Sequence, residues 1–73
     1  MLVQDKIWNA GVRGITYRPA EEEDAIEISA STPEKFNERF QNIKESFPEA
    51  EFLRVKVEFG IYYWYIVRLG EPR

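Results

Sequence analysis

The chain has no cysteine and no histidine among its 73 residues. Without cysteine it cannot form a disulfide, and without either residue type a structural zinc site lacks its usual ligands. The same absences remove the common nucleophile–base pairs of catalysis. We therefore expect a protein that is not an enzyme and that has no metal, no cofactor and no small-molecule substrate.

Long apolar runs are also missing. The longest, residues 60–67, is far shorter than the ~20 residues that span a bilayer. No N-terminal stretch has the pattern of a signal peptide. The lack of cysteine fits a reducing compartment, so we expect a cytoplasmic protein with no membrane association.

The composition predicts one small domain, residues 1–73. A chain of this length buries only ~60% of the surface that its unfolded form exposes, so its core is small. Four Tyr, five Phe and two Trp supply the apolar surface for that core. The formal net charge of −3 argues against a protein that coats nucleic acid by bulk charge.

The first segment, residues 2–8, allows two interpretations. Val3, Ile7 and Ala10 match one face of a short helix that ends at Gly11. The stretch is short, however, and has no helix N-cap. We therefore favour a strand.

A first hairpin is predicted for residues 12–18 and 25–29. Both segments alternate apolar and polar residues, and Pro19 ends the first strand because proline cannot donate to a sheet ladder. Gly14 within the first strand suggests a bulge. The acidic run of residues 21–24 reads as the solvated loop between the strands.

A helix is predicted to follow. Ser31 or Thr32 can cap its N-terminus, Pro33 suits its first turn, and Pro48 stops it. Between these signals lies an apolar stripe at helical spacing that needs a sheet to cover. The stripe consists of Phe36, Phe40, Ile43 and Phe47.

A second hairpin is predicted for residues 51–69. A three-residue loop, residues 58–60, places odd positions opposite odd positions and puts Gly60 where left-handed backbone is needed. One face is then entirely apolar and should pack on the helix. That face comprises Leu53, Val55, Val57, Phe59, Ile61, Tyr63, Tyr65, Val67 and Leu69. This register pairs Lys56 with Tyr62, Arg54 with Trp64, and Phe52 with Ile66.

These elements predict an α+β fold in the order β-β-β-α-β-β. The fold is an antiparallel sheet of four or five strands with one helix packed on one face. The helix stripe and the apolar hairpin face, chiefly Leu53, Val55, Val57, Tyr63, Tyr65 and Val67, form the predicted core.

The outer face of this second hairpin is the candidate functional surface. It mixes cations with aromatics, as interface hot spots do. Long cationic stems that lie over exposed rings would equally explain it as a structural feature. The candidate partner-binding residues are Phe52, Arg54, Lys56, Tyr62, Trp64, Ile66 and Arg68.

We expect a small protein–protein interaction module that forms a homodimer or binds a protein partner through this face. Its size and composition suit an accessory protein of a phage or mobile element. One alternative is single-stranded nucleic-acid binding, in which Tyr62 and Trp64 stack on bases and Arg54, Lys56 and Arg68 meet phosphates. Another is an acidic inhibitor that uses residues 21–24 against a basic target.

Overall fold

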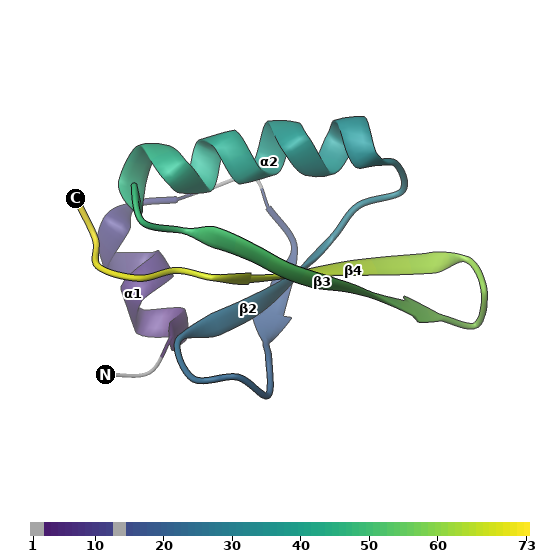
Figure 1. Ribbon diagram of the computed structural model, residues 1–73. Helices are drawn as coiled ribbons and strands as arrows, with labels where there is room; N and C mark the ends of the chain where they lie inside the picture. Colours follow the sequence, from purple (N-terminus) through teal and green to yellow (C-terminus); the bar gives the residue numbers. More distant parts are fainter. Residues whose placement is uncertain (1–2, 13–14) are drawn as a thin grey trace.

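A computed structural model describes residues 3–12 and 15–73 as two helices and four strands. These are α1 (Val3–Ala10), β1 (Tyr17–Pro19), β2 (Ala25–Ser29), α2 (Pro33–Ser46), β3 (Glu51–Glu58) and β4 (Tyr62–Arg68). The strands form one antiparallel sheet in the order β1-β2-β4-β3, and α2 lies across one face of it (Figure 1). The predicted α+β class and antiparallel sheet are confirmed.

The first segment is a helix, so the favoured strand at residues 2–8 is wrong. Gly11 ends α1 with a positive φ of 75°, as the helical alternative required. Ile7 is buried in the main core, and Lys6 Nζ donates to Asp24 Oδ1 at 2.5 Å and to the Gly70 carbonyl at 2.8 Å. These tertiary contacts stabilise a helix that is too short to be stable in isolation.

The first hairpin forms with β2 at its predicted bounds and a shorter β1. Tyr17 lies opposite Ile28, and Pro19 opposite Ile26. The predicted bulge at Gly14 falls outside the described residues. Because β2 also pairs with β4, it lies inside the sheet, and four of its five residues are buried.

Helix α2 begins and packs as its sequence indicates. Thr32 is the N-cap, and its Oγ1 accepts from the Lys35 N–H at 3.2 Å. Three residues of the stripe are buried and Phe40 is partly buried. The Phe36 ring stacks on Tyr65 of β4 with ring centroids 4.3 Å apart, and it also contacts Phe40 at 5.3 Å.

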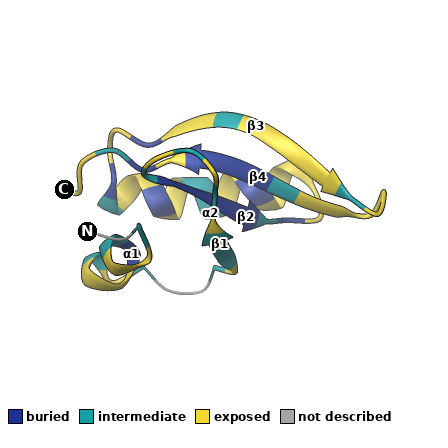
Figure 2. Cartoon of the chain, turned by 90° about the horizontal axis from the view of Figure 1, so that it is seen from below, coloured by how far each residue is buried: buried dark blue, intermediate teal, exposed yellow. Residues whose placement is uncertain are grey.

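The core lies where α1, α2, β2 and the C-terminal half of β4 meet. Figure 2 shows that burial is concentrated in β2 and β4, whereas β3 and the hairpin tip are largely exposed. Figure 1 places α1 and the C-terminal segment at the end of the molecule opposite this tip. The apolar stripe of α2 is therefore covered mainly by β2 and β4, and only part of the C-terminal hairpin (residues 51–69) is buried.

A bulge at Leu53 changes the register of that hairpin near its base. Phe52 lies opposite Val67, and Arg54 lies opposite Ile66, so Leu53 has no directly opposed residue. The extra residue moves Phe52 to the face that carries α2, where its ring lies 5.6 Å from that of Phe36. The prediction that Phe52 faces away from the helix is therefore wrong.

The predicted pairing of the hairpin is offset by two residues, although odd positions do pair with odd positions. Lys56 lies opposite Trp64 and Val57 opposite Tyr63. The cause is the loop, which comprises residues 59–61 rather than 58–60. Phe59 and Gly60 both have positive φ, 54° and 72°, as in primed hairpin turns.

The N-cap of α2 provides a test of this local structure. Thr32→Ala removes the oxygen that accepts from the Lys35 N–H, and we expect the free energy of unfolding to fall by about 1 kcal/mol. Ser31→Ala, one residue earlier, is the matched control and should have a much smaller effect. Urea denaturation followed by circular dichroism measures both, and equal losses would contradict the assignment of Thr32 as the cap.

Candidate interaction surface

One face of the sheet, which we call the polar face, carries a network of ion pairs centred on Glu27. This carboxylate is 5% exposed. Arg18 of β1 donates to Glu27 through Nε and to Glu58 of β3 through Nη2. The Arg18 guanidinium carbon also lies 4.0 Å from the ring centre of Trp64, so the cation covers the indole face. Three strands are thereby joined by one arginine.

The remaining cations of the polar face also have carboxylate partners. Lys56 Nζ lies 3.8 Å from a Glu27 oxygen, and Arg54 pairs with Glu22 of the β1–β2 loop. Arg68 Nη1 lies 2.8 Å from an oxygen of Glu51. The side-chain hydrogen bonds to Glu27 and Glu58 raise the pKa of Arg18 above its ordinary value.

The structure separates the residues that we predicted to form a binding surface. Ile66 is fully buried and Trp64 lies beneath Arg18, whereas Phe52 is on the opposite face of the sheet. Arg54, Lys56 and Arg68 are in ion pairs. Among these seven predicted residues, Tyr62 alone is exposed (57%), lies on the predicted face and is not in an ion pair.

The acidic run at residues 21–24 is partly built into the fold. Asp24 accepts from Lys6 through Oδ1 and from the Gly70 N–H through Oδ2 at 3.0 Å, which ties α1 and the C-terminal segment to the loop. Glu22 contacts Arg54. The side chains that remain exposed in the run are Glu21 and Glu23. Within residues 3–12 and 15–73, no three acidic side chains gather to hold a metal ion.

A second surface stands out at the distal end of the C-terminal hairpin. Among the described residues, every exposed large apolar side chain except Trp8 belongs to the C-terminal hairpin. Apart from Phe52 and Tyr62, these hairpin residues lie between Val55 and the tip. We call them the distal apolar surface. Its residues are Val55, Val57 and Tyr63 on the α2 side of the strands, and Phe59 and Ile61 in the turn that joins the strands.

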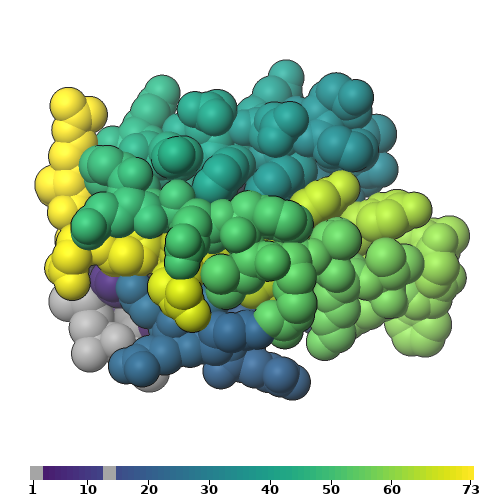
Figure 3. Space-filling model, in the orientation of Figure 1, coloured from purple at the N-terminus to yellow at the C-terminus, as the bar shows by residue number. Residues whose placement is uncertain are grey.

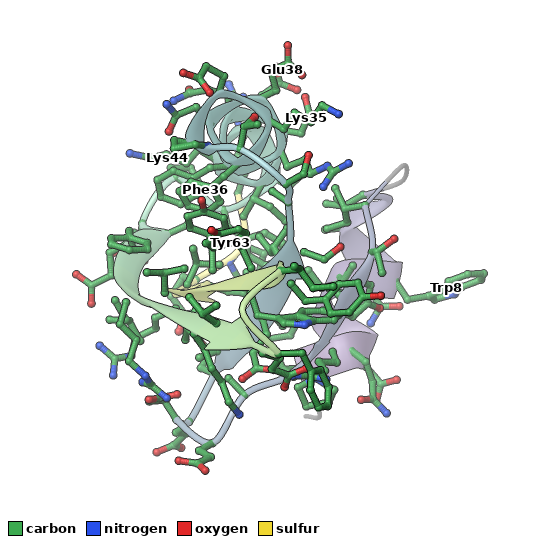
Figure 4. All side chains as sticks on the ribbon, turned by 90° about the vertical axis from the view of Figure 1, so that its right-hand side faces the viewer. Trp8, Lys35, Phe36, Glu38, Lys44 and Tyr63 are labelled. Atoms are coloured by element: carbon green, nitrogen blue, oxygen red, sulfur yellow. The ribbon has the colours of Figure 1, made fainter. Side chains whose placement is uncertain are left out.

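The distal apolar surface exists because the helix stripe is shorter than the strands. From Phe36 to Phe47 the stripe is about 17 Å long at 1.5 Å per residue. The eight residues of β3 extend about 27 Å. The prediction that Val55, Val57 and Tyr63 lie in the core is therefore wrong, because their exposed fractions are 44%, 50% and 37%, whereas Tyr65 and Val67 are buried as predicted. Tyr63 does lie on the helix side of the sheet, below Phe36 (Figure 4).

Strand β3 forms one edge of the sheet along this surface. Its inner edge pairs with β4, and no strand among the described residues pairs with its outer edge. Figure 3 shows residues 51–58 running across the face of the molecule, with α2 on one side and the β1–β2 region on the other. An exposed strand edge presents unpaired N–H and C=O groups, which can pair with another chain.

The hairpin tip adds an aromatic residue in a strained conformation. Phe59 is 89% exposed and has a φ of 54°. Left-handed backbone is unfavourable for a bulky residue by about 1–2 kcal/mol. Because the Phe59 side chain is exposed, contacts within this chain do not offset the cost of that backbone conformation. Strained residues concentrate at functional sites, so this one marks the tip as a candidate contact.

Reasoning from the sequence missed Arg18 and Glu27, because their role depends on β2 lying next to β4. It also treated the whole apolar hairpin face as core. The difference in length between stripe and strands, visible in the sequence, could have revealed the uncovered end. Adjacent apolar residues at Phe52 and Leu53 break the alternation and could have revealed the bulge.

Comparisons with protein families, with curated proteins and with solved structures gave no match to this chain. Neither helix in the described part of the chain is long and apolar enough to cross a membrane. The candidate function therefore depends on the geometry of the hairpin.

The polar face can be tested by neutralising its central carboxylate. Glu27→Gln keeps the side-chain shape but removes the charge that Arg18 and Lys56 share, and we expect the free energy of unfolding to fall by about 1.5–3 kcal/mol. Glu51→Gln is the matched control, since its pair with Arg68 is exposed and should contribute less than about 1 kcal/mol. Urea denaturation of both variants measures the difference. Equal effects would contradict a structural role of the network.

Proposed function

We propose that this protein is a non-enzymatic protein-interaction module that self-associates through the distal apolar surface of its C-terminal hairpin. The observation that carries the proposal is the concentration of exposed apolar side chains at one end of one hairpin. A contiguous exposed apolar surface is typical of an interaction site, whereas scattered apolar residues are not.

The proposal uses the same hairpin as our prediction from sequence but the opposite face. The cations of the polar face are paired with carboxylates, and its aromatic Trp64 is covered by Arg18. A partner on that face would have to displace these ion pairs. The distal apolar surface requires no such displacement, because its side chains are already exposed to water.

A second copy of the chain is the partner that the surface favours. The open edge of β3 carries Arg54, Lys56 and Glu58 at alternate positions, so an antiparallel copy of the same strand can offer the opposite charge. Homo-oligomers with two-fold symmetry bring the same patch of each copy together. The ion pairs also leave few free cations for phosphates, which makes nucleic-acid binding the weaker hypothesis.

A substitution of Phe59 is expected to change stability and self-association in opposite directions. Phe59→Asn creates an Asn-Gly turn that suits the positive φ of this position, so we expect the free energy of unfolding to rise by about 1 kcal/mol. The same variant loses an exposed aromatic contact, so dimerisation should weaken by about tenfold, or about 1.4 kcal/mol. Thermal denaturation of dilute monomer and sedimentation across a concentration series measure the two quantities.

The control for this experiment is Trp8→Ala, which removes an exposed aromatic from α1, at the other end of the molecule. Its self-association should match that of the wild type. A wild-type chain that is monomeric at every concentration would overturn self-association. Equal weakening by Phe59→Asn and Trp8→Ala would overturn the location of the surface.

A further inference from the structure

The open edge of β3 ends at two irregular positions. Toward its N-terminus, the bulge at Leu53 interrupts the ladder. Toward its C-terminus, Phe59 leaves the extended conformation with a φ of 54°. Between them, residues 54–58 are regular strand whose outer edge pairs with no described segment.

We propose that two copies of the chain pair antiparallel along this edge, with Val57 of each copy facing Val57 of the other across a two-fold axis. The pairing joins two four-stranded sheets into one sheet of eight strands. It rests on the proposed function, because it specifies how the self-association takes place. In this register residues 56–58 of the two strands are directly opposed, and Val55 of each copy faces the hairpin tip of the other.

Side-chain faces limit the possible registers. Val55 and Val57 lie on the α2 side of the sheet, whereas Arg54, Lys56 and Glu58 lie on the polar face. A register that opposes odd with even positions would place valines beside charged residues. A two-fold axis perpendicular to the sheet avoids this by opposing odd with odd and even with even.

Charge then selects one register among those that remain. With Arg54, Lys56 or Glu58 on the axis, that residue faces its own copy and repels it. With Val55 on the axis, Arg54 faces Lys56 twice. With Val57 on the axis, Lys56 faces Glu58 twice and no like charges are directly opposed; these contacts add to the pairs of Glu58 with Arg18 and of Lys56 with Glu27 within each copy.

The position of α2 permits this register. The helix attaches to the hairpin through Phe36, which contacts Tyr65 and Phe52. Tyr65 lies opposite Val55 and Phe52 lies farther from the tip, so the helix contacts of the two copies fall on opposite sides of the axis at Val57. The tip of each copy then lies beside Val55 of the other, which gives the exposed Phe59 ring an apolar neighbour.

Single cysteines in β3 test the register, since the chain has no cysteine of its own. In the proposed dimer, two Val57 Cα atoms lie about 4.5–5.5 Å apart, which is suitable for a disulfide. Two Val55 Cα atoms are offset by four residues, or about 13 Å. Val57→Cys should therefore give about tenfold more disulfide-linked dimer under mild oxidation than the matched variant Val55→Cys, whose sulfurs would be beyond bridging distance.

Lys56→Cys completes the scan and separates the outcomes on a non-reducing gel. Trapping that is strongest at position 57 supports the register, and trapping that is strongest at 56 overturns it. Self-association that none of the three cysteines traps overturns edge pairing, yet leaves the proposed function in place. A wild-type chain that sediments as a monomer throughout overturns both.

Charge exchange gives an independent test of the Lys56–Glu58 pairs. Lys56→Glu and Glu58→Lys each create two like-charge contacts in the dimer, so each variant alone should dimerise about tenfold more weakly than wild type. Their equimolar mixture should recover wild-type affinity, because each heterodimer opposes only unlike charges. Recovery is measured by sedimentation, after circular dichroism has shown that both variants are folded. Failure of the mixture to recover when both variants are folded would overturn the register.

Discussion

The stacking of Phe36 on Tyr65 determines how the rest of the molecule is divided. This contact attaches α2 to β4, and the neighbouring ring of Phe52 extends the attachment to β3. Toward the chain termini from this point, β2 and β4 are largely buried and form the core. Toward the hairpin tip, beyond the contacts that the end of β2 and the residue after it make with Trp64 and Tyr63, β3 and β4 continue as a two-stranded ribbon with one uncovered apolar side. A two-stranded ribbon is only marginally stable by itself, so the anchored half must support the free half.

The two faces of the sheet are stabilised by different interactions. On the polar face, Arg18 links β1, β2 and β3 through Glu27 and Glu58 and shields Trp64. Such a network requires specific partners at specific positions, so it favours one arrangement of the strands over others. On the α2 side, apolar contacts provide the stability and continue past the helix. The interaction surface that we propose is therefore on the side whose groups are not already paired.

The sequence predicts the elements with strong local patterns. The spacing of Phe36, Phe40, Ile43 and Phe47 identified α2, and the alternation around Gly60 identified the second hairpin and its odd-with-odd pairing. Three features depended on contacts distant in sequence and could not be obtained this way. The helix α1 depends on the tertiary contacts of Lys6 and Ile7. The position of Phe52 depends on the bulge at Leu53. The contacts of Arg18 depend on the pairing of β2 with β4. The surface that we propose lies on the same hairpin as the surface predicted from sequence, but its strand residues are on the other face.

The hydrogen bonds among Lys6, Asp24 and Gly70 place α1 and the C-terminal segment on one side of the molecule. A protein domain joined to either end would extend away from the hairpin tip and would not obstruct it. In a sheet built from two copies, these attachment points lie at its two extremes. Such an assembly would hold the two attachment points at a separation fixed by the paired hairpins rather than by a flexible linker.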